Sequence, residues 1–144
     1  IQARADAVRA SMPPLGKCGV GVYDGLALLA TAELAKVDVV LESGTAGGTS
    51  TELMARFFPS VNVTTVDLAV SSASPVCAPK VRKTHERLAA FPNVKAIVGD
   101  SFKVFPNLIQ QHAGKRVGVF IDGPKGMKAL DLCLDSIKRS RDVK

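Results

Sequence analysis

The nine residues 42–50 read Glu-Ser-Gly-Thr-Ala-Gly-Gly-Thr-Ser and combine a carboxylate with glycines and hydroxyl side chains. Glycines let a backbone turn sharply and let a ligand approach it closely. Thr49 and Glu52 have the spacing of a capping box, which predicts that a helix begins there. Free N–H groups at a helix start favour a carboxylate or a phosphate. The segment therefore predicts a turn that binds an anionic group.

Carboxylates also follow the apolar runs that we expect to form strands: Glu42, Asp67, Asp100 and Asp122. In open parallel sheets, ligands bind outside the carboxyl ends of the strands. A row of acids at that edge therefore indicates a polar ligand. Asp67 lies 19 residues after Gly48, close to the offset of about 20 residues that a ribose-binding acid has in nucleotide-binding folds.

The elements that must position these residues alternate between strand and helix. We expect helices at residues 1–10, 22–36, 49–58, 79–91, 101–113 and 127–139, and strands at 37–42, 61–67, 94–99 and 116–122. Short apolar strands joined by helices are typical of a parallel sheet buried on both faces. With right-handed crossovers, the pattern predicts an α/β fold with a Rossmann-like, doubly wound parallel sheet.

Local patterns add two expectations about the helices. Asp24 is a candidate N-cap for the helix at 22–36. The helix at 127–139 is expected to bury an apolar face made of Leu130, Cys133, Leu134 and Ile137.

Length and composition limit the kind of protein. A chain of 144 residues, 47% hydrophobic and 22% charged, predicts a single globular domain, with N-terminal helices at 1–36 and βα repeats at 37–144. No apolar run reaches the ~18–20 residues of a membrane span. The scattered cysteines Cys18, Cys77 and Cys133 favour reduced thiols and a cytoplasmic location over a disulfide scaffold.

The charge is uneven along the chain, with a net of −2 in residues 1–72 and +8 in residues 73–144. The basic half is either a solvated face or a surface that attracts an anionic substrate. A chain with no Trp and one Tyr lacks the aromatic side chains on which nucleic-acid-binding modules stack bases, which argues against such a partner.

The glycine-rich turn discriminates between nucleotide-binding families. The pattern GxGxxG fails, because Ala46 and Thr49 occupy two of its glycine positions, whereas ExGxxxGxS fits from Glu42 to Ser50. Here the chain resembles the class I S-adenosylmethionine-dependent methyltransferases, and most of all the small-molecule O-methyltransferases of the catechol and caffeoyl-CoA type. The similar stretches are LESGTAGGTSTELMARFFP (41–59), VTTVD (63–67), VGDS (98–101) and VFIDGPKG (119–126).

The resemblance implies S-adenosylmethionine as the cofactor and assigns roles to particular residues. Ser50 would donate its hydroxyl to the methionine carboxylate, Asp67 would accept from the ribose hydroxyls, and Asp100 or Ser101 would contact the adenine amine. Glu42, Gly44, Ala46 and Gly48 of the turn would also bind the cofactor, with the two glycines admitting its methionine moiety. Structural alternatives remain open for these residues: the glycines serve only a tight turn, Ser50 and Asp100 only cap helices, and Asp67 is a plain surface acid.

The resemblance also implies a substrate side after the fourth strand. Asp122 and Lys125 match an aspartate that binds metal and a lysine that acts as base, so both are candidate catalytic residues. The intervening Gly123-Pro124 departs from the family pattern, and the family's other metal ligands follow a fifth strand that this sequence does not reach. We therefore predict no metal site from these residues.

These expectations lead to a methyltransferase that acts on an oxygen of a small, anionic molecule. The alternatives are a non-catalytic module with this fold, used for binding or oligomerisation, and another nucleotide-binding enzyme. The fold is expected to be truncated after the fourth strand and its helix. In the order 3-2-1-4, residues 117–121 (VGVFI) would form an apolar sheet edge, to be covered by further polypeptide or by a second chain in a homo-oligomer.

Overall fold

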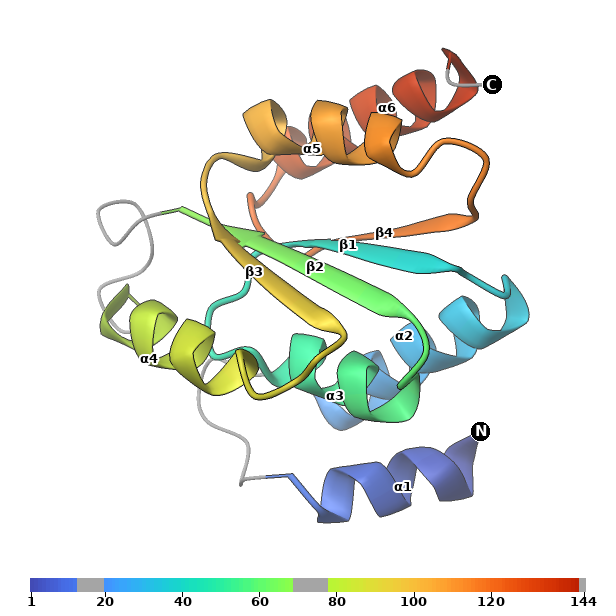
Figure 1. The fold of residues 1–144 in the computed structure, drawn as a ribbon, viewed down its shortest axis with the longest axis vertical. Helices are drawn as coiled ribbons and strands as arrows, with labels where there is room; N and C mark the ends of the chain where they lie inside the picture. The colour runs from blue at the N-terminus through green and yellow to red at the C-terminus, as the bar shows by residue number, and fades with distance from the viewer. Residues whose placement is uncertain (13–19, 69–77, 143–144) are drawn as a thin grey trace.

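One parallel sheet organises the computed structural model, which describes residues 1–12, 20–68 and 78–142. Its strands run in the order β3-β2-β1-β4 (Figure 1). They are β1 (Val39–Ser43), β2 (Asn62–Asp67), β3 (Val94–Val98) and β4 (Val117–Ile121). The order and the parallel pairing confirm the predicted doubly wound sheet.

Helices cover both faces of this sheet. They are α1 (Gln2–Ala10), α2 (Val22–Leu34), α3 (Thr49–Phe57), α4 (Ala78–Leu88), α5 (Ser101–Gln111) and α6 (Met127–Asp142). Helices α5 and α6 lie on one face, and α2, α3 and α4 lie on the other (Figure 1). Helix α1 packs on α2 and α3 from the outside. Because the described strands pair in parallel, their carboxyl ends lie at the same edge of the sheet.

Alternate residues of β1 supply the two cores, because successive strand side chains point to opposite faces. Val40 belongs to the core under α2 and α3, together with Leu29, Leu53 and Phe57. On the other face, Leu41 packs with the α5 and α6 residues Phe105, Leu108 and Leu132. Complete burial of such a side chain stabilises the fold by about 1.5–3 kcal/mol.

The two local predictions for the helices are wrong. Helix α2 begins at Val22 with Gly21 as its N-cap, and Asp24 lies within the first turn. Helix α6 is rotated relative to the predicted face. It buries Leu132 and Ser136, while Leu130, Leu134 and Ile137 remain 46–55% exposed. The contacts with α5 and β4, and not the apolar stripe alone, decide which face is buried.

Two of the three cysteines fall outside the residues that the structure describes. Cys18 and Cys77 lie in segments that the structure does not describe, and Cys133 is a free thiol. Within the described part of the chain, none of the helices has the length and apolar character that a bilayer crossing needs.

Candidate functional site

The turn between β1 and α3 is shaped by residues with positive φ. Gly44 has φ +97°, Ala46 has φ +42° and Gly48 has φ +69°. Inside the turn, the N–H of Gly48 donates to the carbonyl of Thr45 at 2.6 Å. Left-handed backbone is costly for residues with a Cβ, so glycine suits two of these positions.

The two glycines also lie against other parts of the protein. A Cβ on Gly44 would lie 2.7 Å from the backbone N of Gly123, and a Cβ on Gly48 would lie 2.5 Å from Cγ2 of Thr84. Both glycines therefore permit close packing of the turn on the β4 turn and on α4. This geometry supports the tight-turn alternative for both residues.

Asp67, at the end of β2, is bonded to this turn. Its Oδ2 accepts from the N–H of Ala46 at 2.7 Å, and its Oδ1 accepts from the N–H of Leu68 at 2.7 Å. The structure thus brings the predicted ribose-binding acid to the predicted cofactor turn. Each carboxylate oxygen keeps acceptor capacity beyond these bonds.

Glu42 is fully buried beneath the turn and accepts hydrogen bonds from the hydroxyls of Ser50 and Thr51. Burial raises the pKa of Glu42, whereas the hydroxyl hydrogen bonds act in the opposite direction, and the negative charge of Asp122 raises it further. The Ser50 hydroxyl is therefore directed to Glu42 and not outward. Glu42 supports the start of α3 from within the protein.

The start of α3 differs from the expected capping box. Its N-cap is Gly48, which has no side chain to cap the helix, and Glu52 pairs with arginines instead of the helix start. The helix begins at Thr49, as predicted, but the expected capping box is absent, because Thr49 is already helical and no side chain caps the helix. The first N–H groups of a helix have no intrahelical acceptor, so the end of α3 at the turn offers donors to an anion.

The polar residues of the VGDS segment (98–101) make hydrogen bonds within the protein. Asp100 is the N-cap of α5, and its Oδ1 accepts from the N–H of Phe102 at 3.0 Å. The hydroxyl of Ser101 is buried and lies 2.6 Å from that of Ser43. The capping interpretation of Asp100 is confirmed. The Ser101 hydroxyl is committed to the Ser43 side chain, so this geometry does not favour it for the adenine.

Sequence reasoning missed an apolar surface beside Asp67. Leu68 is 43% exposed, Val98 is 58% exposed and Phe102 is 37% exposed. Val98 pairs with Asp67 in the sheet register, and Leu68 is the next residue along the chain. The signal was available, since Leu68 directly follows the β2 acid Asp67 and Phe102 lies two residues after the α5 N-cap Asp100. Such a surface suits a flat, apolar group such as a purine base.

Asp122 and Lys125 form an ion pair after β4, with their side chains 50% and 78% exposed. The N–H groups of Asp122 and Gly123 both donate to the carbonyl of Ser43 at 2.9 Å. These bonds place the pair beside the turn that follows β1. The structure thus brings the predicted catalytic residues next to the predicted cofactor turn.

Further titratable groups lie near the site. His85 on α4 is half-buried, and its Nε2 has no hydrogen-bond partner. Burial lowers the pKa of His85, and the charge of Asp67 opposes that effect.

Among the described residues, no group of His, Cys, Asp and Glu side chains is arranged to hold a metal ion. A small pocket between α1, α2 and α3 has no lining residue from the carboxyl edge of the sheet.

Comparison with solved structures identifies the same fold in methyltransferases. An O-methyltransferase from Bacillus cereus in complex with SAH has a TM-score of 0.61, 20% identity and coverage of 99% of this chain. The O-methyltransferase TomG from Streptomyces achromogenes, involved in tomaymycin synthesis and solved with SAM, has a TM-score of 0.60, 21% identity and 99% coverage. A SAH-bound methyltransferase from Podospora anserina has a TM-score of 0.57, 19% identity and 94% coverage.

This likeness confirms the resemblance in fold to class I S-adenosylmethionine-dependent methyltransferases. The chain spans only 55–60% of the length of these three structures. No protein-family model matches the chain, and no curated protein matches it.

Proposed function

We propose that this chain binds S-adenosylmethionine at the turn 44–48 and takes part in methyl transfer to an oxygen of a small, anionic molecule. The observation that carries the proposal is the hydrogen bond between Asp67 and the N–H of Ala46. It joins a carboxylate suited to a ribose to a turn suited to an anion. The shared fold with methyltransferases solved with SAM or SAH supports it.

The side chains at the carboxyl edge fit the parts of this cofactor. Asp67 retains acceptor capacity for two ribose hydroxyls. The uncapped N-terminus of α3 offers N–H groups to the methionine carboxylate. Leu68 and Val98 would pack against the adenine ring, and Asp100 would accept from its amine.

The cofactor, when bound, supplies a methyl group on a sulfonium that an acceptor oxygen can attack. The protein's part is to hold that oxygen aligned and to remove its proton. We assign these tasks to Asp122 and Lys125, which pair beside the Ser43 carbonyl. Lys125 would hold an anionic acceptor, pass one of its protons to the Asp122 carboxylate and take up the proton of the acceptor hydroxyl, and the sulfonium that loses its methyl group would leave as neutral SAH.

Calorimetric titration with S-adenosylmethionine and SAH tests the cofactor assignment. We expect one site per chain and a rise in melting temperature. An NADH titration in parallel tests the alternative nucleotide-binding enzyme, which would enhance the fluorescence of NADH. SAH formation with a panel of phenolic and carboxylate acceptors then tests the methyl-transfer step.

An exposed apolar surface on α6 and the β4 edge supports a second candidate function, that of a non-catalytic module used for oligomerisation. Helix α6 exposes Met127, Leu130, Leu134 and Ile137 at helical spacing, and Val119 of the β4 edge is 39% exposed. Such a face and edge suit association with a second copy of this chain. A stable dimer in sedimentation velocity that Leu134→Lys dissociates, together with no methyl transfer to any acceptor, would favour this candidate.

A further inference from the structure

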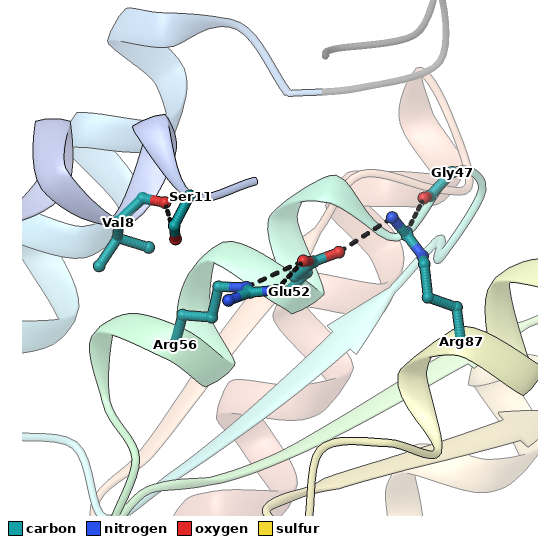
Figure 2. Close-up of polar contacts among 6 residues, drawn as sticks. All are labelled: Val8, Ser11, Gly47, Glu52, Arg56 and Arg87. Carbon is teal, nitrogen blue, oxygen red and sulfur yellow. Dashed lines mark hydrogen bonds and ion pairs between the residues drawn. The ribbon is translucent and has the colours of Figure 1, made fainter. Parts of the chain in front are cut away.

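Arg87 of α4 contacts two separate parts of the candidate site. Its Nη2 donates to the carbonyl of Gly47 at 2.7 Å, and its Nη1 lies 2.9 Å from Oε2 of Glu52 (Figure 2). The first contact is with the cofactor turn, and the second is with α3. One guanidinium therefore joins α4, the turn and the helix that follows the turn.

The position of this guanidinium is fixed by a buried charge. Glu52 is 2% exposed, and its Oε1 pairs with Arg56 at 2.9 Å while its Oε2 pairs with Arg87 (Figure 2). A buried carboxylate needs charged or hydrogen-bonding partners. The planar guanidinium of Arg87 presents its donors in a rigid fork, so the pair with Glu52 also orients the donor that reaches Gly47.

The contact with Gly47 controls more than one carbonyl. The peptide between Gly47 and Gly48 is planar, so the direction of the Gly47 carbonyl sets the direction of the Gly48 N–H. That N–H closes the turn by donating to Thr45. Two peptides earlier, Asp67 holds the N–H of Ala46, whose peptide also carries the Thr45 carbonyl. Arg87 and Asp67 thus hold the peptides 47–48 and 45–46 of the turn from two different elements.

Helix α4 also packs directly on the turn. A Cβ on Gly48 would lie 2.5 Å from Thr84 Cγ2 and 3.2 Å from Nη2 of Arg87. Gly48 therefore lies close against α4, and the hydrogen bond from Arg87 ties the neighbouring Gly47 to the same helix.

We propose that Arg87 is a positioning residue that holds the turn 44–48 in its binding shape before the cofactor arrives. A turn that is already ordered loses less conformational freedom on binding, which raises affinity. The inference rests on the proposed function, because it takes this turn to be the cofactor site.

Arg87→Ala and Arg56→Ala form a matched pair for the test. Each removes one guanidinium from Glu52, but only Arg87 reaches Gly47. In the free protein, Arg87→Ala should speed amide hydrogen exchange at residues 46–48, whereas Arg56→Ala should leave it unchanged. In calorimetry, Arg87→Ala should weaken SAH binding about ten- to hundred-fold, and Arg56→Ala by less than about three-fold. Low millimolar guanidinium ion should restore affinity to the first variant and leave the second unchanged.

Equal exchange at residues 46–48 in the two variants would overturn the inference, because Arg87 would then serve only the charge of Glu52. If the wild-type chain fails to bind SAH while Arg87→Ala still speeds exchange, the positioning role stands and the proposed function fails. If Arg87→Ala does not fold, Arg87→Lys replaces it, since lysine keeps a charge for Glu52 without the fork. Exchange as slow as in the wild-type chain would then contradict the inference.

Discussion

The Oδ2 atom of Asp67 lies 2.7 Å from the backbone N of Ala46, across 21 residues of sequence. This hydrogen bond ties the end of β2 to the turn after β1. It places a carboxylate beside a glycine-rich helix start, which is the arrangement on which the proposed function depends.

Substitution of Asp67 by Ala should weaken SAH binding by about 1–3 kcal/mol, because a charged hydrogen-bond acceptor is lost. Calorimetric titration measures the effect. Asp38→Asn is the control, since Asp38 also accepts from a backbone N–H and pairs with Arg116, but it precedes β1 at the opposite end of the sheet. Unchanged affinity in Asp67→Ala would remove this carboxylate from the site.

Gly48→Ala should destabilise the protein more than Gly114→Ala. Both glycines have positive φ, +69° and +76°, but only at Gly48 would the new Cβ meet a side chain, at 2.5 Å from Thr84. Backbone strain costs about 1–2 kcal/mol at each position, and the clash should add about 1–3 kcal/mol at Gly48. Urea unfolding of both variants measures the difference. Equal losses in the free energy of unfolding would show that α4 does not pack tightly against Gly48.

Glu42→Gln should alter the pH dependence of stability. Burial raises the pKa of Glu42 above its ordinary value of 4.5. The stabilisation that comes from its protonated form is therefore fully present below pH 4.5 and is lost as the pH rises through the folded-state pKa. Glutamine carries no charge at any pH. The free energy of unfolding of Glu42→Gln should therefore increase, relative to that of the wild-type chain, as the pH rises. The free energy of unfolding of the wild-type chain falls by about 1.4 kcal/mol for each pH unit over which Glu42 is protonated in the native state but ionised in the unfolded state.

Urea unfolding of both chains between pH 4 and pH 8 provides the measurement. The free-energy difference between Glu42→Gln and the wild-type chain removes the contributions of the other titrating groups. A difference that stays constant with pH would contradict the assignment of a raised pKa to Glu42.

Leu132→Ala should cost about 2–5 kcal/mol of stability, because Leu132 is fully buried against α5 and β1. Leu134→Ala should change stability by about 0.5 kcal/mol or less, because Leu134 is 55% exposed. Thermal unfolding of the two variants identifies which face of α6 is buried in solution. A larger loss of stability in Leu134→Ala than in Leu132→Ala would show that α6 buries the face expected from the sequence.

Lys125→Ala should lower methyl transfer about 10²- to 10⁴-fold, as expected for loss of a group that moves a proton. The affinity for SAH and the melting temperature should not change, because Lys125 is 78% exposed and lies outside the proposed cofactor contacts. SAH formation, with calorimetry alongside it, separates the two effects. A loss of SAH affinity that equals the loss of rate would contradict a role on the acceptor side.

Much of the fold follows from patterns that are local in the sequence. Apolar runs ending at Glu42, Asp67 and Asp122 predicted strands whose ends meet at one edge, because parallel strands share their direction. The spacing from the turn to Asp67 likewise predicted that the two would meet. These relations depend on strand direction and order, and both can be predicted from alternating strands and helices.

What the sequence did not predict depends on packing between distant elements. Helix α6 carries apolar residues on more than one face, and its contacts with α5 and β4 select the one with Leu132. Glu52 has the spacing of a capping residue, yet the distant Arg87 and the nearby Arg56 pair with it. The sequence suggests that the Ser50 hydroxyl binds the cofactor, but in the structure this hydroxyl donates to the buried Glu42.

A calorimetric titration of the wild-type chain with SAH, repeated with Asp67→Ala, tests the cofactor site most directly. We predict binding at one site per chain and weaker binding by the variant. If SAH produces neither heat nor a shift in melting temperature with the wild-type chain, the turn 44–48 and Asp67 do not form a cofactor site.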